Sequence, residues 1–250
     1  MKTGLIGYTG FVGSNLCEQK SFSEYFNSSN IEKIKNHEFD MLICAGLSGT
    51  KYKINKNPSS DLCNINNQKK LLKAIQVDKI NFISTIDVFD KKNNVNEKFE
   101  IDPRKLDNYS KNRYDFEQFI KNQFNNYFII RLPMLFGQGL KKNVLYDLQN
   151  NQFLQNINQN SFFQWYCLNN LYEDIKYLIK KEIRLINLIS EPIIIDEIIN
   201  RFFKYGNFKN KNEIIRTDIK SLYAPANGPC ENYIYSKKQI LGEMESYLSG

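Results

Sequence analysis

The sequence opens with an apolar run that leads directly into a series of glycines. Residues 4–13 read GLIGYTGFVG, so that Gly4, Gly7, Gly10 and Gly13 recur at every third position. Glycine in ordered backbone carries an entropic cost, which indicates a need for unusual dihedral angles or for close approach to a bulky group. A strand followed by a glycine turn that opens a helix is the geometry of dinucleotide binding. We adopt this interpretation for Gly7, Gly10 and Gly13, against the alternative of a plain tight turn.

Short apolar runs alternate with stretches of helical spacing over the first half of the chain. We expect strands at 2–6, 41–45, 79–84 and 127–132, and helices at 11–20, 62–75 and 109–124. This rhythm is typical of a parallel sheet covered on both faces, so the expected fold class is α/β, a Rossmann-type doubly wound parallel sheet. After Pro133, long polar stretches alternate with short apolar ones. We therefore expect a dinucleotide-binding core at 1–133 and a smaller mixed substrate-binding lobe at 134–250, packed on the core as one structural unit.

The predicted cofactor site surrounds the glycine turn and the next apolar run. It consists of Gly7, Thr9, Gly10, Phe11, Val12, Gly13, Asn27, Ser28, Ala45, Gly46, Tyr109 and Arg113. An acidic residue about 20 positions after the turn would bond the adenosine ribose of NAD. This sequence offers Asn27 and Ser28 there, which could accept either a ribose hydroxyl or a 2′-phosphate. The choice between NAD and NADP stays open at this point, with a slight preference for NADP.

Charge and composition narrow the class of partner. The net charge of +7 is compatible with nucleic acid or with small anionic ligands, but no basic run of five residues occurs, so we expect no nucleic-acid partner. The five cysteines lack a CxxC spacing, and His37 is the single histidine, so we expect reduced thiols and no metal site. We also expect no signal peptide, no membrane span and a cytoplasmic location.

Two later stretches extend the pattern toward a known family. FISTIDVF (82–89) reads as a strand that ends in Ser84 and Thr85, and NYSKNRYDFE (108–117) begins a helix near Tyr109. Together with GYTGFVG, ICAG (43–46) and RLPMLFG (131–137), these stretches resemble the extended short-chain dehydrogenase/reductase superfamily, in its NAD-dependent epimerase/dehydratase branch that acts on nucleotide-sugars. Each motif alone is weak, whereas their order and spacing over roughly residues 1–140 are fairly specific.

The resemblance implies roles for three residues. Thr85 would hydrogen-bond the substrate oxygen, and Tyr109 would exchange a proton while the nicotinamide moves a hydride. The family has a lysine four residues after the tyrosine, which bonds the nicotinamide ribose and lowers the tyrosine pKa, and this sequence has Arg113 there. A fixed cation favours the phenolate, so we expect Arg113 to hold the ribose and tune Tyr109. The alternative is a catalytically weak or inactive dinucleotide-binding or sensing protein on the same fold.

A second departure from the family concerns the reaction. In its 4,6-dehydratases an Asp-Glu pair follows the threonine, whereas here Ile86 and Asp87 follow Thr85. Ile86 cannot move a proton, so dehydration ranks below 4-epimerisation or ketone reduction. The expected function is that of an NAD(P)-dependent oxidoreductase or epimerase acting on a nucleotide-activated sugar, in surface polysaccharide biosynthesis.

By the same resemblance, the segments after RLPMLFG would hold the nucleotide-sugar. The expected substrate-binding residues are Asp87, Lys141, Lys142, Asn143 and Gln164, with the two lysines either on a diphosphate or simply solvated. Trp165 and Tyr166 either stack on a nucleobase or face the core. A homodimer through the helix that carries Tyr109 is also possible, with Tyr114, Phe116 and Phe119 as its candidate face.

Overall fold

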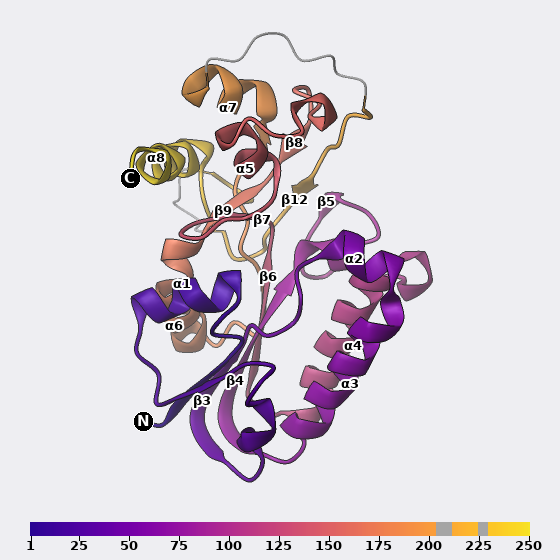
Figure 1. Ribbon diagram of the computed structural model, residues 1–250, viewed down its shortest axis with the longest axis vertical. Helices are drawn as coiled ribbons and strands as arrows, with labels where there is room; N and C mark the ends of the chain where they lie inside the picture. Colours follow the sequence, from indigo (N-terminus) through magenta and orange to yellow (C-terminus); the bar gives the residue numbers. More distant parts are fainter. Residues whose placement is uncertain (204–211, 225–229) are drawn as a thin grey trace. The chain divides into compact units, whose positions relative to one another are not determined.

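The computed structural model describes residues 1–203, 212–224 and 230–250 (Figure 1). The chain packs into two compact units: the first contains Met1–Asp90, Glu100–Arg131 and Asn169–Leu185, and the second contains Lys91–Phe99, Leu132–Leu168 and Ile186–Gly250. The expected boundary after residue 133 is close to one of the points where the chain leaves the first unit and enters the second, which follows Arg131. The two-domain division and the packing of a lobe on a core stay predictions. None of the helices in the described ranges is long and apolar enough to cross a membrane.

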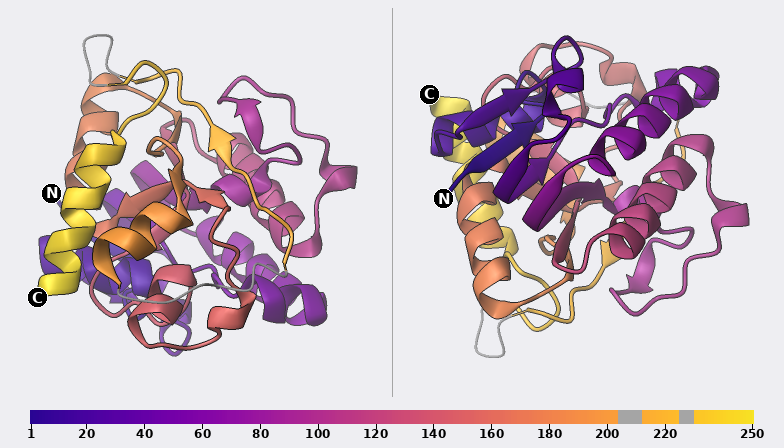
Figure 2. Two further views of the ribbon diagram at one scale, coloured as in Figure 1. Left: turned by 90° about the horizontal axis from the view of Figure 1, so that it is seen from above. Right: turned by 90° about the horizontal axis from the view of Figure 1, so that it is seen from below.

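A six-stranded sheet forms the centre of the first unit, with the strand order β10-β6-β4-β3-β1-β2. Strand β1 pairs in parallel with β2 and with β3, and β3 pairs in parallel with β4. Helices α1 and α6 cover one face of the sheet, and α3 and α4 lie side by side on the other (Figures 1 and 2). The predicted doubly wound α/β fold class is therefore confirmed. The elements are β1 (Thr3–Ile6), α1 (Phe11–Gln19), β2 (Glu24–Phe26), η1 (Ile31–Ile34), β3 (Glu38–Cys44), α2 (Lys51–Lys56), α3 (Pro58–Leu72), β4 (Gln76–Thr85), η2 (Ile86–Val88), η3 (Pro103–Lys105), α4 (Asn108–Gln123), β6 (Tyr127–Leu132), α6 (Leu171–Lys181) and β10 (Leu185–Asn187).

The strand order reverses at β1, because β2 lies on one side of it and β3 on the other. In doubly wound sheets, ligands bind outside the carboxyl ends of the strands at such a switch point. Gly7 follows β1 directly, and Ala45 and Gly46 follow β3. The topology thus brings the glycine turn and the ICAG segment to one edge of the sheet.

Helix α3 differs from the expected helix at 62–75. It begins earlier, at Pro58, whose fixed φ suits the first helical position, and it ends at Leu72. Its buried residues include Asp61 and Ile65, whereas Leu62 is 47% exposed. Leu62 therefore lies one position beyond the buried face of the helix. An acidic side chain, that of Asp61, takes the core-facing position.

Helix α4 packs on the sheet through aromatic side chains. The ring of Phe116 is fully buried, with its centroid 4.8 Å from that of Phe82 and 5.6 Å from that of Phe119. Phe116 was expected on a dimer face, and this expectation is wrong because its side chain belongs to the core. Tyr114 is half-buried. A homodimer stays a prediction.

A buried ion pair also fixes α4 on the sheet. Arg131 of β6 donates from Nε to Glu117 Oε1 (2.9 Å) and from Nη2 to Glu117 Oε2 (2.7 Å). Ser84 of β4 donates its hydroxyl to the same carboxylate at 2.6 Å. Burying a charge is costly unless it is paired and hydrogen-bonded, which this arrangement provides. The contact therefore sets the position of α4 relative to the ends of β4 and β6.

The second unit contains short paired strands and three α-helices among the described residues. Strands β7 and β9 pair in parallel, β8 and β11 antiparallel, and β12 and β5 in parallel. Helix α8 contacts β9, and α7 contacts β11. The elements are β5 (Asn93–Val95), β7 (Met134–Phe136), α5 (Val144–Gln149), η4 (Leu154–Asn156), β8 (Phe162–Phe163), β9 (Trp165–Cys167), η5 (Leu168–Asn170), β11 (Ile193–Ile194), α7 (Ile195–Phe202), β12 (Asp218–Ile219) and α8 (Lys237–Ser249).

We expect two Glu→Gln substitutions, one in the buried ion pair and one in an exposed ion pair, to differ strongly in their effect on the free energy of unfolding. Glu117→Gln leaves the Arg131 cation buried without its counter-charge, and we expect it to lower the free energy of unfolding by about 3–5 kcal/mol. Glu245→Gln removes the acidic partner of Arg201 in an exposed pair, and we expect a loss below about 1 kcal/mol. Urea denaturation of both variants measures the difference. Equal losses would show that the buried pair does not hold α4.

Candidate active site

Nearby backbone atoms leave no room for a side chain at two of the glycines in the turn. Gly7 has φ +91°, and a Cβ on it would lie 2.5 Å from the carbonyl oxygen of Ala45. A Cβ on Gly13 would lie 2.0 Å from the carbonyl oxygen of Gly7. The turn closes with a hydrogen bond from Gly10 N to Gly7 O at 2.9 Å. Gly7 therefore permits the turn beside β3, and Gly13 permits close packing of α1 on it, as predicted for the first and third glycines.

The start of α1 is open on its outer side. Gly10 is the N-cap of the helix and is exposed, and it has no side chain with which to cap the first helical N–H groups. Thr9 is exposed, and Phe11 and Val12 are half-buried. Unpaired N–H groups and the helix dipole at such an end attract anions. The turn thus has the features that a pyrophosphate requires.

The end of β2 lies beside the same turn, because Gly7 N donates to Phe26 O at 2.7 Å. The next residue, Asn27, accepts at Oδ1 from the backbone N–H (2.9 Å) and the hydroxyl (2.6 Å) of Ser29. Ser28 is exposed. The amide oxygen of Asn27 is therefore engaged in its own turn, and Ser28 is the more accessible polar side chain at this strand end.

Ala45 and Gly46 form the other wall of the turn. Ala45 N donates to Ile6 O at 2.9 Å, which continues the pairing of β3 with β1. A Cβ on Gly46 would lie 2.8 Å from Ile6 Cγ2. Both predicted residues therefore lie against the base of the glycine turn.

Thr85 and Tyr109 meet at the same edge of the sheet. Thr85 ends β4, and its hydroxyl accepts from Asp87 N at 3.1 Å. Tyr109 is in the first turn of α4, and its side chain hydrogen-bonds Thr85. The two hydroxyl groups therefore lie next to each other, and their roles toward a substrate stay predictions.

Burial controls the acidity of Tyr109, which is 8% exposed. Desolvation raises its pKa from 10.0 to about 12, with the carboxylates of Asp87 and Asp61 acting in the same direction. The Arg113 cation and the hydrogen bond with Thr85 lower the pKa without cancelling this effect. We expected Arg113 to bring the tyrosine closer to its working range. Arg113 does act in the expected direction, but burial outweighs it, so the pKa of Tyr109 stays raised.

Arg113 is bound to the protein itself. It donates from Nη1 to Asp61 Oδ2 (2.5 Å) and from Nη2 to Asp61 Oδ1 (3.0 Å), in a buried fork between α4 and α3. Its Nη2 also donates to Ser48 O at 2.5 Å, and its Cζ lies 4.2 Å from the centroid of the Tyr109 ring. These bonds occupy both terminal nitrogens of the guanidinium. The structure therefore gives Arg113 a role in joining elements, where the sequence predicted a contact with ribose.

Asp61 was missed by the sequence analysis. It also accepts from Asn112 Nδ2 at 2.8 Å, so its carboxylate serves two neighbouring residues of α4. The available signal was its place four residues before Ile65, on the apolar stripe of a helix. A carboxylate in that position needs a cationic partner, which Arg113 provides.

Asp87 lies beside this centre. Its Oδ1 is 3.4 Å from Nζ of Lys51, a residue of α2 that the sequence analysis also missed. Lys51 follows the ICAG segment in a polar stretch with no periodic signal, so its place beside Asp87 depends on the fold.

Of the predicted substrate residues in the second unit, the two lysines are exposed and Asn143 has a structural role. Lys141 and Lys142 are exposed. Asn143 caps α5, since its Oδ1 accepts from the N–H groups of Leu145 (3.0 Å) and Tyr146 (3.1 Å). The prediction that Asn143 binds substrate is not supported, because this oxygen stabilises the helix start.

Gln164 and its neighbours belong to the interior of the second unit. The Gln164 amide donates to the carbonyl groups of Ser190 (2.7 Å) and Ile219 (2.8 Å) and accepts from Ile219 N (2.8 Å). It is 1% exposed, which contradicts the predicted contact with substrate. Trp165 and Tyr166 are fully buried, so core packing is the correct alternative for them.

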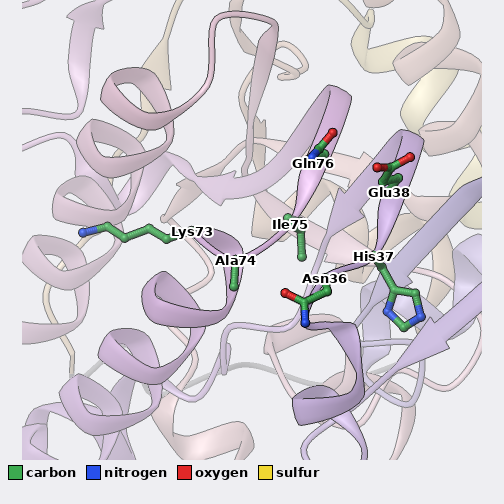
Figure 3. A pocket seen from close by; sticks show the side chains of 7 residues that line it. All are labelled: Asn36, His37, Glu38, Lys73, Ala74, Ile75 and Gln76. Carbon is green, nitrogen blue, oxygen red and sulfur yellow. The ribbon is translucent and has the colours of Figure 1, made fainter.

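A hollow of about 320 Å³ lies at the opposite, amino edge of the sheet (Figure 3). It is lined by Asn36, His37, Glu38, Lys73, Ala74, Ile75 and Gln76. Residues Glu38 and Gln76 begin β3 and β4, so this hollow is separate from the carboxyl-edge site. No predicted site residue is in its lining. In the described part of the chain, no group of three or more His, Cys, Asp or Glu side chains could hold a metal ion.

Solved structures with the same fold extend over almost the whole chain. A dTDP-4-dehydrorhamnose reductase from Yersinia enterocolitica is 15% identical, with a TM-score of 0.68, 100% of this chain covered and 99% of that chain. The same kind of reductase from Bacillus anthracis, in complex with NADP, is 18% identical, with a TM-score of 0.63 and coverage of 94% and 89%. A UDP-glucose 4-epimerase from Thermotoga maritima with UDP-glucose is 10% identical, with a TM-score of 0.61 and coverage of 90% and 91%.

The chain thus shares its predicted Rossmann-type α/β fold with these solved structures. No protein-family model matches the sequence, and no curated protein matches it by sequence. At sequence identities of 10–18%, the similarity shows a shared fold and no more. A proposal about function therefore depends on the residues of the site.

The glycine geometry predicts opposite effects of two Gly→Ala changes. Gly13→Ala places a methyl group against the carbonyl of Gly7, and we expect a loss of about 1–3 kcal/mol in the free energy of unfolding. Gly242→Ala, in helix α8 with nothing within 4 Å of the added carbon, should raise it by about 0.5–1 kcal/mol. Urea denaturation of each variant tests both signs. A neutral Gly13→Ala would contradict the close packing of α1 on the turn.

Proposed function

We propose that this protein is an NAD(P)-dependent oxidoreductase that reduces a keto group of a nucleotide-activated sugar. The observation that carries the proposal is the convergence of two sets of residues at the carboxyl edge of one sheet. The glycine turn after β1 supplies a cradle for a pyrophosphate, and the hydrogen-bonded pair of Thr85 and Tyr109 supplies a hydroxyl that can move a proton. The residues present fit a dinucleotide, because Gly10, the exposed N-cap of α1, places no side chain over the first N–H groups of the helix.

Tyr109 is the proposed proton donor of the reaction. A hydroxyl whose pKa is about 12 keeps its proton at neutral pH, so Tyr109 is a proton donor. Reduction of a ketone needs such a donor, whereas oxidation of an alcohol, the first step of an epimerisation, needs a phenolate base. We propose reduction, with epimerisation as the alternative reaction of the same residues.

In the proposed mechanism, Thr85 orients the keto oxygen and Tyr109 donates its Oη proton to that oxygen. A reduced nicotinamide cofactor, held through its pyrophosphate at Gly7, Gly10 and Gly13, would supply the hydride for the carbonyl carbon. The products are an alcohol and the oxidised cofactor, and solvent returns the proton to Tyr109. Ile86 replaces the aspartate of the family's dehydratases and cannot move a proton, which leaves Asp87 as the one carboxylate of that pair and ranks water loss below reduction.

The substrate class follows from the neighbours with the same fold. The reductases named above act on a dTDP-linked 4-keto sugar, and the epimerase binds UDP-glucose, so we propose a nucleoside-diphosphate sugar with a keto group. Lys141 and Lys142, exposed in the second unit, are the proposed contacts with the diphosphate. NADPH is the proposed cofactor, because residues 27–30 read NSSN and provide no carboxylate for a free ribose hydroxyl. A role in surface polysaccharide biosynthesis stays a prediction.

One observation favours a second function. The guanidinium of Arg113 is paired with Asp61, which removes the cation that the family uses on the ribose. A catalytically weak dinucleotide-binding or sensing protein would tolerate this pairing. The two functions differ in whether Tyr109 is needed for anything besides structure.

Substitution of Tyr109 separates these functions. Tyr109→Phe removes the proton donor, so we expect kcat for a keto-sugar nucleotide to fall at least about 100-fold. The affinity for NADPH, measured by calorimetric titration, should stay unchanged, and NADH should bind more weakly than NADPH. Tyr114→Phe, on the same helix and half-buried, is the matched control and should retain full activity. Undiminished turnover in Tyr109→Phe would exclude the catalytic assignment, and no turnover by the unmodified protein with any keto-sugar nucleotide would support the sensing function.

A further inference from the structure

The backbone N–H of Tyr109 is hydrogen-bonded from outside its own helix. Tyr109 is the second residue of α4, and the first four N–H groups of an α-helix have no acceptor within the helix. Its N–H donates to Oδ1 of Asn55, a residue of α2, at 2.9 Å in a part-buried contact. A shielded N–H group costs free energy when it has no partner. The start of α4 therefore depends on a side chain from another helix.

The N-cap residue of α4 has other partners. Asp107 Oδ1 accepts from Ser110 N at 2.8 Å. Asp107 Oδ2 is 3.1 Å from Lys51 Nζ. The N-cap side chain thus serves the next N–H group along the helix, and Asn55 serves that of Tyr109.

Asn55 is itself held in place by the chain on either side of it. Its neighbour Ile54 is 5% exposed and anchors α2 in the interior. Before α2, Ser48 O accepts from Arg113 Nη2 at 2.5 Å. After it, Pro58 begins α3, which also contacts α2. The amide oxygen of Asn55 is therefore a fixed point against which the first turn of α4 is set.

The place of the Tyr109 hydroxyl depends on this first turn. The hydroxyl end of the side chain hydrogen-bonds Thr85, which ends β4 in the sheet. The backbone end is bonded to Asn55. Tyr109 is thus held at two points, and the pair with Thr85 requires that α4 begins at the correct distance from the sheet. A misplacement of about 1 Å can slow a reaction by up to about 100-fold.

We propose that Asn55 is a positioning residue of the proposed reduction: its amide oxygen holds the backbone of Tyr109 so that the phenol stays beside Thr85. The inference rests on the proposed function and adds to it a residue that the sequence analysis did not predict. Asn55 touches neither the substrate nor the cofactor in this account. It acts through Tyr109 alone.

The test uses variants of Asn55 with a control two residues later. In Asn55→Ala the first turn of α4 loses its external acceptor, so kcat should fall about three- to tenfold. The affinity for NADPH, measured by calorimetry, should be unchanged. Asn55→Asp keeps an acceptor oxygen of the same reach and should restore most of kcat. Asn57→Ala, at an exposed residue whose side chain makes no capping hydrogen bond, should not alter kcat.

Two results of this comparison would overturn the proposal. One is an unchanged kcat in Asn55→Ala, and the other is an equal loss in Asn57→Ala. Tyr109→Phe provides an internal check, because Asn55→Ala should have no further effect on the residual turnover when the phenol is absent. An undiminished effect in that background would show that Asn55 acts by another route and would also overturn the proposal.

NMR measurements keep the inference testable even if the proposed function fails. Hydrogen exchange of the Tyr109 amide should be faster in Asn55→Ala and should return to the parent rate in Asn55→Asp. A difluorotyrosine placed at position 109 reports the surroundings of the ring, and its 19F spectrum should change and return in the same two variants. An unchanged exchange rate or an unchanged 19F spectrum in Asn55→Ala would overturn the proposal. Changes in both, without any turnover by the parent protein, would support the placement of the phenol by Asn55 and count against the oxidoreductase function alone.

Discussion

The buried ion pair between Arg113 and Asp61 is the interaction on which the candidate site depends. Neither charge could be buried alone, and the fork satisfies both while joining α3, α4 and the segment at Ser48. The pair holds the start of α4 in place with Tyr109 almost excluded from solvent. It also gives the Arg113 cation an internal partner, while burial is the largest influence on the pKa of Tyr109. The proposed function uses this tyrosine as the proton donor to a keto oxygen.

The remaining geometry follows from two requirements of the sheet. At the switch point, β1 and β3 lie so close that only glycine fits at Gly7, and only glycine at Gly13 lets α1 approach the turn. On the other side of β3, the ion pair of Glu117 with Arg131, joined by Ser84, fixes α4 on β4 and β6. Both devices bring side chains that are far apart in sequence to one carboxyl edge. The cradle and the proton donor therefore share a single framework.

Local patterns predicted most of the first unit and little of its charge network. Each strand, the glycine turn and the helix of Tyr109 is indicated by a pattern of residues that are close together in the sequence. All of these elements are present in the structure. The partner of Arg113 is 52 residues away, and nothing in a single sequence marks that distance. Gln164 and Asn143 were expected to bind substrate because both are polar and follow a family motif. Their amide groups instead satisfy backbone N–H and C=O groups inside the second unit, a demand that only the fold defines.

Isotope transfer tests the central claim most directly. The protein would be incubated with NADPH carrying deuterium at the transferable position and with a nucleoside-diphosphate 4-keto sugar, and the sugar product would be examined by mass spectrometry and NMR. Reduction predicts an alcohol that carries one deuterium on the former carbonyl carbon, together with stoichiometric NADP. An epimerised sugar without net transfer, or an unchanged sugar in the presence of bound cofactor, would contradict the account.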